Sequence, residues 1–459
     1  MINDIIVAVS TPPGEGAIGI IRLSGEGVIE KVAKIFNPYN ERLALTERRN
    51  FTLALGWIVA ANGDRVDEVL ISIMRAPHSY TGEDVVEINC HGGSVALRAC
   101  LQRCLDQGVR LAEPGEFTKR AFLNDRLDLD QAEAVLDIIR AKTERGLQLA
   151  VKQLAGRQGR FIAELEEKLL GLNAMVDASL DFPEEVGDLD QDQTRLILRE
   201  TIDEIDRLLE AGRRVEVYRE GIDLAIVGKP NVGKSSLLNA LARKEKAIVT
   251  EIPGTTRDIV EEYINVRGIP VKLMDTAGIR ATEDLVEKIG VEKAKELISQ
   301  ADLVVLVLDF GTGIAAEDME IFQSIPAAKR LVLVNKEDIA RKAISEAELV
   351  EKFASSKIIR ASVKEDYGLD ELESAIEELL LQGSPSADGL EIMINMRQKN
   401  ALQKCRAHAE NAWHELGQVP LDCLGVDIWG ALECLGELSG RSLKDEIIDR
   451  IFHDFCIGK

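Results

Sequence analysis

Gly228-Lys229-Pro230-Asn231-Val232-Gly233-Lys234-Ser235-Ser236 is the stretch that decides how the middle of this chain folds. An apolar run, Ile222–Val227, precedes it, and a helix-like apolar pattern, Leu237–Leu241, follows it. A glycine-rich turn between a strand and a helix aims several backbone N–H groups at one point, where a phosphate binds. In this motif Lys234 neutralises the outer phosphates and the Ser235 hydroxyl contacts Mg²⁺. The stretch therefore predicts a nucleotide site, with a plain glycine turn between core elements as the alternative.

Two tetrapeptides downstream narrow the choice of nucleotide. Asp275-Thr276-Ala277-Gly278 follows the strand-like run Val271–Met274, and an Asp at such a strand end can hold Mg²⁺ through water. Asn335-Lys336-Glu337-Asp338 follows Leu331–Val334. A carboxylate at Asp338 can accept hydrogen bonds from N1–H and the exocyclic amine of guanine, a donor pair that adenine lacks. Each tetrapeptide is a weak signal alone, but the three motifs in this order predict guanine.

With these motifs the central segment resembles a translation-factor-type GTPase domain. The whole chain is similar to the MnmE (TrmE) family of tRNA wobble-uridine modification GTPases, from Thr11-Pro12-Pro13-Gly14 to the last four residues, Cys456-Ile457-Gly458-Lys459. Gly254-Thr255-Thr256-Arg257-Asp258 is similar to the first switch of that family. Ser362-Val363-Lys364 stands in the place of its guanine-contacting loop, with Val where Ala is more usual.

The resemblance implies a GTP site made of the phosphate loop, the switches and the base-binding segments. The implied GTP contacts are Asn231, Val232, Gly233, Lys234, Ser235, Ser236, Thr250, Glu251, Ile252, Pro253, Gly254, Thr255, Thr256, Asp275, Thr276, Ala277, Gly278, Asn335, Lys336, Glu337, Asp338, Ser362, Val363 and Lys364. The implied metal ligands are Ser235 and Thr256 for Mg²⁺, and Asn231, Thr250, Ile252 and Thr255 for K⁺. A bound K⁺ offsets negative charge that develops between the phosphates. From the sequence alone, turn chemistry explains Asn231 equally well.

Hydrolysis needs a group that orients the attacking water. Many small GTPases use a Gln directly after Asp-x-x-Gly, but here that position is Ile279, which cannot hydrogen-bond water. The resemblance implies that Glu287 takes this role, and the alternative is that Glu287 caps a helix or faces solvent. Arg257 and Arg280 are candidates for an arginine finger, and a cation from solvent is the alternative.

Bulk properties restrict the class of protein. A chain of 459 residues is too long for one core and suggests about three domains. Its net charge of −23 argues against indiscriminate binding to nucleic acid, although a local basic surface can still bind RNA. Its seven cysteines lack metal-type CxxC spacing, and Cys100 and Cys104, which share a helix face, are expected to be buried apolar residues rather than metal ligands. With no apolar run of membrane-spanning length and no basic N-terminal region, we expect a cytoplasmic protein without a membrane partner.

The pattern of apolar residues predicts a multidomain fold. Residues 1–118 alternate short β-type runs, such as Ile5–Val9 and Val85–Asn89, with Gly/Pro turns, which predicts an α+β domain. Residues 119–217 and 382–459 have helical periodicity and are expected to form one bundle split by an insert. Residues 218–381 alternate strands and helices, which predicts an α/β P-loop GTPase (G) domain with a parallel sheet. The resemblance implies the same arrangement, with folate binding and dimerisation in the first domain.

The C-terminal tail carries a second kind of chemistry. Cys456 follows a helix and is close to Lys459, and a neighbouring ammonium favours the thiolate. The resemblance implies that this Cys is needed for tRNA modification and that 5-formyltetrahydrofolate binds at Arg22, Glu87, Arg126 and Lys459. Arg126 stands where the family often has Lys. His91, between polar and glycine residues, is expected to stabilise a turn, with acid/base chemistry as the alternative.

Taken with the resemblance, these features predict a cytoplasmic homodimer that hydrolyses GTP with K⁺ and Mg²⁺. It is expected to join an FAD-dependent MnmG-type partner in a heterotetramer and to add a carboxymethylaminomethyl or aminomethyl group at C5 of the wobble uridine of tRNA, with a folate as one-carbon donor. One rival is a ribosome-assembly or translation GTPase that binds RNA without modifying it. The other is a folate-dependent methyltransferase whose GTPase part is a sensor.

Overall fold

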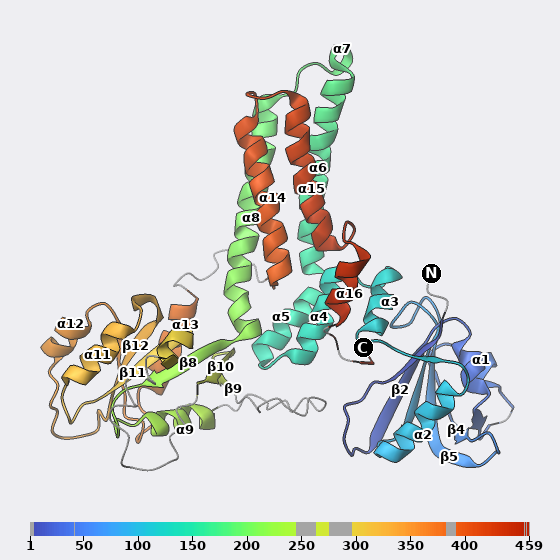
Figure 1. Ribbon diagram of the computed structural model, residues 1–459, viewed down its shortest axis with the longest axis horizontal. Coiled ribbons are helices and arrows are strands. Elements are labelled where there is room, and N and C mark those ends of the chain that lie inside the picture. The colour runs from blue at the N-terminus through green and yellow to red at the C-terminus, as the bar shows by residue number, and fades with distance from the viewer. Residues whose placement is uncertain are drawn as a thin grey trace.

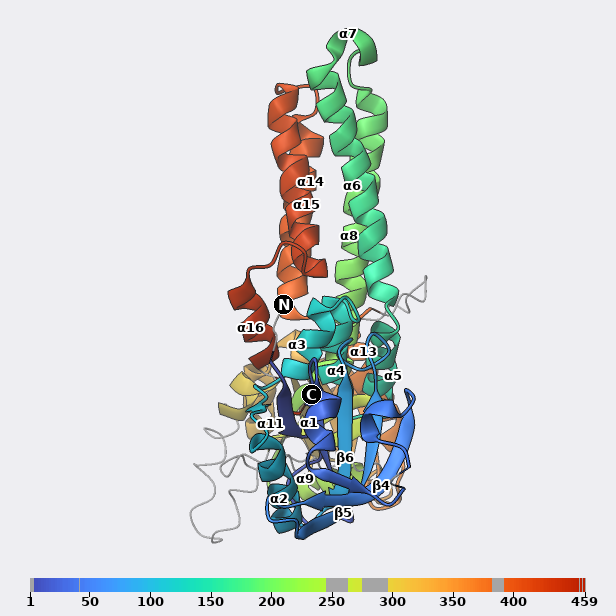
Figure 2. The same cartoon turned by 90° about the vertical axis from the view of Figure 1, so that its right-hand side faces the viewer.

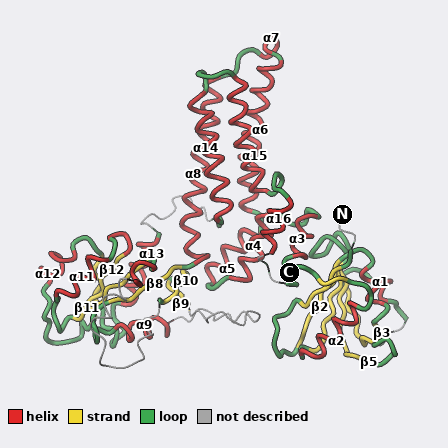
Figure 3. Tube along the Cα trace, in the orientation of Figure 1, coloured by secondary structure: helices red, strands yellow, loops and turns green. Residues whose placement is uncertain are grey.

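A computed structural model describes residues 4–40, 42–244, 263–274, 296–381, 392–453, 455 and 457–458. Two β-sheets lie at the base of a tall helical stalk, one on each side of it (Figure 1). Coloured by secondary structure, the chain shows helices along the stalk and strands gathered at its two feet (Figure 3). The predicted multidomain fold class is therefore confirmed.

The N-terminal sheet has seven strands in the order β3-β4-β5-β6-β2-β1-β7. Its elements are β1 Ile6–Val9, β2 Ile18–Ser24, α1 Val28–Ala33, β3 Phe36–Pro38, the 3₁₀ turn Leu45–Glu47, β4 Thr52–Val59, β5 Arg65–Met74, β6 Val85–His91, α2 Ser94–Leu105 and β7 Arg110–Leu111. Neighbouring strands from β3 to β1 pair antiparallel, whereas β7 pairs parallel with β1. This part of the chain is therefore an α+β domain, as its sequence predicts.

Pleating gives this sheet one buried face and an opposite, open face that is covered only near β1, where Ile6 and Ala8 pack with Phe117. The residues aligned across the buried face include Ile21, Ala54, Ile71 and Ile88. On the other face Arg22 and Glu87 are direct cross-strand partners on β2 and β6. On the same face the apolar side chains Leu53 and Leu55 of β4 are 58% and 50% exposed. The open face therefore presents both charged and apolar side chains to its surroundings.

Three cysteines lie beneath the buried face. Cys90 of β6 is 3% exposed, and Cys100 and Cys104 of α2 are 0% and 1% exposed. The prediction that Cys100 and Cys104 share a buried helix face is confirmed. A hydrogen bond between the Cys90 and Cys100 thiols lowers the pKa of Cys90 and raises the pKa of Cys100.

The stalk is a bundle of four long helices from two distant parts of the chain. The helical elements of this part are α3 Glu116–Leu123, α4 Leu129–Arg140, α5 Glu144–Leu154, α6 Arg157–Asp181, α7 Pro183–Val186, α8 Gln191–Glu220, α14 Met396–Glu415, α15 Leu421–Ser439 and α16 Asp445–His453. Leu169 of α6, Leu198 of α8, Leu402 of α14 and Leu435 of α15 meet in one core, each at most 2% exposed. Two views at right angles show these helices side by side (Figures 1 and 2). The predicted split bundle is confirmed, and none of its described helices has the length and apolar character to cross a membrane.

The second sheet has six strands in the order β13-β12-β11-β8-β10-β9. Its elements are β8 Ile222–Val227, α9 Lys234–Lys244, β9 Tyr263–Val266, β10 Ile269–Leu273, β11 Leu303–Asp309, α11 Ala316–Ser324, the 3₁₀ turn Ala327–Lys329, β12 Arg330–Asn335, α12 Glu346–Phe353, β13 Lys357–Arg360 and α13 Leu369–Leu380. Every residue of β11 is buried, as expected for a central strand with both faces covered. Five strands pair parallel, as predicted.

One strand departs from the predicted parallel sheet. β9 pairs antiparallel with β10 through the two-residue turn Arg267-Gly268, in which both residues have positive φ. Such a turn matches the right-handed twist of the strands that it joins. The chain between α4 and α5 holds this turn, because the Thr143 hydroxyl donates to the Gly268 carbonyl at 2.7 Å and Lys142 Nζ lies 3.5 Å from the centre of the Tyr263 ring.

A buried polar network joins α4 to the start of α14. The Gln398 amide is fully buried and donates to Asp130 at 2.6 Å and to Glu133 at 2.8 Å. Arg397 forms two hydrogen bonds to the same Glu133 carboxylate. Burial raises the pKa of Asp130 well above its ordinary value. This network therefore fixes the second half of the bundle on the first. It also buries the Asp130 carboxyl, whose ionised form is destabilised there.

We expect Asp130→Asn to raise the melting temperature at neutral pH. The folded-state pKa of Asp130 lies above its unfolded value of about 3.9, so the buried carboxyl favours folding below that pH and opposes it increasingly as the pH rises through the folded pKa. The amide keeps an oxygen acceptor for Gln398 and removes the buried charge. Thermal melts of variant and parent between pH 4 and pH 8 should give a difference that grows with pH.

Asp177→Asn, on the exposed side of α6, is the matched control and should change the melting temperature little at any pH. A gain in Asp130→Asn that is independent of pH would contradict this explanation.

Candidate functional site: a nucleotide loop and a docked tail

The phosphate loop lies between the end of β8 and the start of α9, as predicted. Gly228 has φ +142°, and a Cβ at this position would lie 2.4 Å from the Val307 carbonyl oxygen. Gly233 has φ +104°, and a Cβ there would lie 2.2 Å from the Asn335 amide nitrogen. Neither position accepts a side chain, so the turn depends on both glycines.

Lys234 is held at the mouth of this loop. Its Nζ donates to the carbonyl oxygens of Gly228 at 2.7 Å and Lys229 at 2.6 Å. Burial lowers the pKa of Lys234, and the charge of Glu317 opposes this shift without cancelling it. A phosphate group beside Lys234 would stabilise the charged ammonium further. Ser235 and Ser236 follow on the first turn of α9 and are exposed, so the Ser235 hydroxyl is accessible to a metal ion beside that phosphate.

Asn335 ties the phosphate loop to the predicted base-binding segments. Its amide nitrogen donates to the Val232 carbonyl at 2.9 Å, and its amide oxygen accepts from the Val363 backbone N–H at 3.1 Å. Lys336 has φ +67° and directs Nζ to the Asn231 carbonyl at 3.1 Å. Segments that are far apart in sequence thus meet along one edge of the sheet, at the carboxyl ends of β8 and β12.

Asp338 is well placed to accept donors from a base. Its side chain is exposed, and the buried Ser362 hydroxyl donates to one carboxylate oxygen at 2.6 Å. This hydrogen bond lowers the pKa of Asp338, so the group is ionised at neutral pH. Glu337 is anchored nearby, because its N–H donates to the Ala361 carbonyl at 3.0 Å and its carboxylate pairs with Lys342. The geometry presents an ionised acceptor at the rim of the site.

Several predicted site residues lie outside the described residues. They are Thr250, Glu251, Ile252, Pro253, Gly254, Thr255, Thr256, Asp275, Thr276, Ala277, Gly278, Glu287, Cys456 and Lys459. The described strand β10 and Met274 lead directly to the first residue of the Asp275–Gly278 motif.

A second cluster of predicted residues lies on the open face of the N-terminal sheet. Arg22 Nε donates to the Glu87 carboxylate at 2.8 Å, and the two side chains are only 15% and 21% exposed. The Arg22 guanidinium lies 5.2 Å from the centre of the Tyr80 ring and 5.9 Å from that of Phe117. A half-buried cation between an anion and two aromatic rings can recognise both carboxylates and flat heterocycles.

Arg126 approaches the same cluster from the loop after α3. Its Nε donates to the Ser79 carbonyl at 3.3 Å, next to Tyr80. Burial raises the pKa of Tyr80, and both Arg22 and Arg126 act on it in the opposite direction. Of the four predicted folate contacts, Arg22 pairs with Glu87 and lies with Arg126 around Tyr80, and Lys459 lies outside the described residues.

The C-terminal tail docks on this cluster. The Gly458 carbonyl accepts a hydrogen bond from Ser10 Oγ at 3.0 Å and another from Arg22 Nη1 at 3.3 Å. Gly458 has φ +90°, and a Cβ there would lie 2.5 Å from the Val9 carbonyl oxygen. The close approach of the tail therefore requires glycine at this position.

Both sites also contain residues that the sequence did not indicate. Ser10 lies just before the quoted Thr11–Gly14 segment and has no local pattern that indicates a tail-binding role. Asp309 is 6% exposed and pairs with Lys336 at 2.7 Å. An Asp that ends a wholly apolar strand is a signal that could have identified it.

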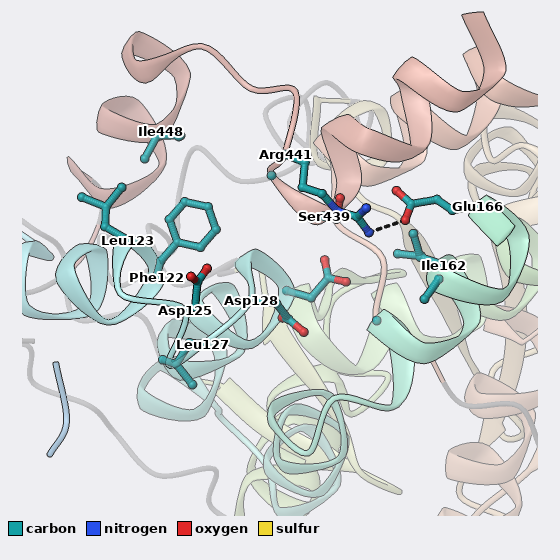
Figure 4. A pocket seen from close by; sticks show the side chains of 14 residues that line it. Phe122, Leu123, Asp125, Leu127, Asp128, Ile162, Glu166, Ser439, Arg441 and Ile448 are labelled. Atoms are coloured by element: carbon teal, nitrogen blue, oxygen red, sulfur yellow. Dashed lines mark hydrogen bonds and ion pairs between the residues drawn. The ribbon is translucent and has the colours of Figure 1, made fainter. Parts of the chain in front are cut away.

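A cavity of about 540 Å³ opens between α3, α4, α6 and α16 (Figure 4). Phe122, Asp125, Asp128 and Ile448 line it, and an ion pair between Arg441 and Glu166 crosses its edge. Burial raises the pKa of Asp128. None of the predicted site residues lines this cavity, and its carboxylates make it a poor binding site for phosphate.

Comparisons with known proteins agree with this architecture. The family described as the MnmE helical domain matches residues 129–456, and that of the GTP-binding protein TrmE N-terminus matches residues 5–126. The chain is 61% identical over 459 residues to the tRNA modification GTPase MnmE of Syntrophomonas wolfei subsp. wolfei, with 100% of both proteins covered. It is 49% identical over 467 residues to that of Moorella thermoacetica, again with 100% of both covered.

Among solved structures, the G domain of the T. maritima FeoB iron transporter is 28% identical to this chain. The matched region spans 34% of this chain and 98% of the FeoB chain. Its TM-score of 0.25 is too low to support any argument. The full-length sequence identities and the two family matches, in contrast, are decisive. The chain belongs to the MnmE (TrmE) family of tRNA modification GTPases.

Proposed function

We propose that this protein is a cytoplasmic GTPase that needs K⁺ and Mg²⁺ and modifies tRNA together with an FAD-dependent MnmG-type partner. The proposed product carries a carboxymethylaminomethyl or aminomethyl group at C5 of the wobble uridine. A folate such as 5-formyltetrahydrofolate supplies the one-carbon unit. Family membership supports GTP hydrolysis and tRNA modification. The observation that supports a folate-dependent modification is the hydrogen bond from Arg22 to the Gly458 carbonyl. It brings the proposed folate site next to the tail that contains Cys456.

The nucleotide loop supports the GTPase part of the proposal. Lys234 would exchange its two backbone carbonyl acceptors for phosphate oxygens, which are stronger acceptors because they are charged. Ser235 and Thr256 would hold Mg²⁺, which neutralises charge on the outer phosphates when bound. Glu287 is the proposed water-orienting residue, since Ile279 has no hydrogen-bonding side chain. Asp338 would accept the two N–H donors of guanine.

Asn231 is the described member of the proposed K⁺ site. Its φ of +63° is compatible with Asn and strains most other residues. Its backbone carbonyl accepts from Lys336, while no described residue is hydrogen-bonded to its exposed side-chain amide. A neutral amide oxygen beside the phosphate loop is a ligand that suits a monovalent cation. Thr250, Ile252 and Thr255 would complete the site.

The folate proposal rests on the cluster around Arg22. Glu87 would accept N–H bonds from the pterin, and Arg22 and Arg126 would bind the carboxylates of the glutamate part or orient the ring. The Tyr80 ring offers a flat surface beside Arg22. Lys459, next in sequence to the docked Gly458, would add a further cation.

The proposed assembly follows from the same face of the sheet. We assign residues 1–118 to folate binding and dimerisation, 119–217 and 382–459 to the helical domain, and 218–381 to the G domain. The exposed Leu53 and Leu55 would pack against a second copy, because large apolar side chains gathered on one sheet face favour a covered interface. The homodimer would then join the MnmG-type protein in a heterotetramer that binds tRNA.

We expect Asp338→Asn to weaken GTP binding by about tenfold to a hundredfold, because a charged acceptor contributes about 1.5–3 kcal/mol. Xanthosine triphosphate should bind the variant better than GTP does, since xanthine has a carbonyl where guanine has its amine. Titration of fluorescent nucleotide analogues measures both affinities. Asp366→Asn, an exposed neighbour with φ +55° that Asn tolerates, is the control and should leave both unchanged.

Asn231→Gly tests the cation proposal without straining the backbone, because Gly also accepts positive φ. The parent should hydrolyse GTP faster in KCl than in NaCl at matched ionic strength, and the variant should turn over equally slowly in both. Phosphate release under multiple-turnover conditions gives the rates. Equal rates of the parent protein in the two salts would refute the K⁺ site.

Cys456→Ser should abolish wobble-uridine modification and leave GTP hydrolysis largely intact, because the proposal separates the two chemistries. Nucleoside analysis of tRNA from a deletion strain that carries each variant measures the first, and phosphate release measures the second. Cys423→Ser, an exposed cysteine on α15, is the matched control. Arg22→Gln should lose modification and folate binding together.

The outcomes also separate the rival functions. Unchanged tRNA nucleosides in the deletion strain would favour an RNA-binding GTPase that modifies nothing. Loss of both activities in Cys456→Ser would end the proposed division between the tail and the nucleotide loop.

A further inference from the structure

We propose that Asp67, Cys90 and Cys100 form a binding site for a zinc-type divalent metal ion. A carboxylate oxygen of Asp67 and the two sulfur atoms all lie within 4.8 Å of one another. Two thiolates and one carboxylate are ligands that Zn²⁺ prefers, and their separation allows them to converge on one ion. The site is independent of the nucleotide loop and of the proposed folate site.

Three elements deliver the ligands to one place. Asp67 lies near the start of β5, Cys90 lies near the end of β6, and Cys100 lies in the middle of α2. Their exposed fractions are 9%, 3% and 0%, so the cluster lies between the sheet and the helix and only Asp67 reaches the surface. A structural Zn²⁺ has four ligands, so an ion held by these three side chains would need one further ligand, such as water.

Charge explains why an ion is favoured here. Asp67 is a carboxylate at the edge of a core formed by residues such as Val69 and Ile71, where an ion without compensation is costly. One of its oxygens accepts from the His91 backbone N–H at 2.9 Å, and the other lies 2.6 Å from His91 Nδ1. The Cys90 thiol is directed to the Gly19 carbonyl at 3.2 Å. A divalent cation would compensate the carboxylate and both thiolates at once.

His91 connects this buried cluster to solvent. Its side chain is 68% exposed, yet its ring contacts the Asp67 carboxylate. A carboxylate paired with an imidazole is held in a fixed orientation, which tunes its affinity for metal. His91 also marks the side from which an ion can enter. The expected turn-stabilising His is thus bonded to the cluster through both its ring and its backbone.

The opposite faces of β6 keep the two sites apart. Cys90 and Glu87 are three residues apart on one strand, so their side chains point to opposite faces of the sheet. The metal would fasten α2 to the buried face, while Arg22 and Glu87 remain on the open face. The metal would therefore join two elements of the fold without touching the proposed reacting groups.

Cobalt is the probe that tests this site. Full-length protein, reduced and freed of metal with a chelator, should bind one Co²⁺ with thiolate-to-metal charge-transfer absorption, and Zn²⁺ should displace it. Cys90→Ala and Cys100→Ala should each lose this absorption. His91→Ala should weaken Co²⁺ binding by about 10–100-fold, the usual effect of losing such an outer partner. Cys423→Ala, which removes a remote exposed thiol, should leave the spectrum unchanged.

Asp67→Asn keeps both thiols and provides a second line of evidence if a cysteine variant fails to fold. It should bind Co²⁺ at least about tenfold more weakly while hydrolysing GTP at the parent rate. The proposal is wrong if the parent shows no sulfur-to-cobalt absorption, or if either cysteine variant retains it. GTP hydrolysis and tRNA modification are measured separately, so failure here leaves the proposed function untouched.

Discussion

The packing of α14 against α8 is the contact on which the arrangement of the whole chain depends. Gly212 of α8 is buried against Ile394, and a Cβ at Gly212 would lie 2.7 Å from the Ile394 side chain. This close approach brings the chain that leaves the bundle after α8 back to the bundle before α14. Both ends of the inserted sheet are thereby fixed to one core, which also contains Leu169 and Leu435. A larger residue at Gly212 would push apart the two halves of the stalk.

The two candidate sites offer different physical means of binding an anion. In the nucleotide loop, two glycines leave room for the backbone to approach a ligand, and the partly buried Lys234 supplies a cation. On the N-terminal sheet, Arg22 already has an anionic partner in Glu87 and gains selectivity from the aromatic rings beside it. A chain with a net charge of −23 can therefore bind anionic ligands at places where local cations are sheltered from the bulk charge.

What the sequence could predict depends on how local the signal is. The strand, glycine turn and helix around Lys234 follow from adjacent residues, and the split bundle follows from helical periodicity on both sides of the insert. The Arg22–Gly458 contact joins residues 436 positions apart, and no local pattern records it. The antiparallel β9 could have been recognised from Arg267-Gly268, because Gly there permits a tight turn between two apolar runs. The cluster of Asp67 with Cys90 and Cys100 needed the fold, since its ligands have no motif spacing.

The hydrogen bond between the start of α5 and the β9–β10 turn has a mechanical consequence. Thr143 holds the Gly268 carbonyl, and β10 leads straight to the Asp275 motif of the nucleotide site. α8 enters the same sheet through β8 and has 30 residues, a length of about 45 Å at the usual rise per residue. A tilt of about 10° at its foot would displace the far end of the stalk by about 8 Å. The stalk can thus act as a lever arm, which converts a small rearrangement beside the nucleotide into a large displacement at a distance.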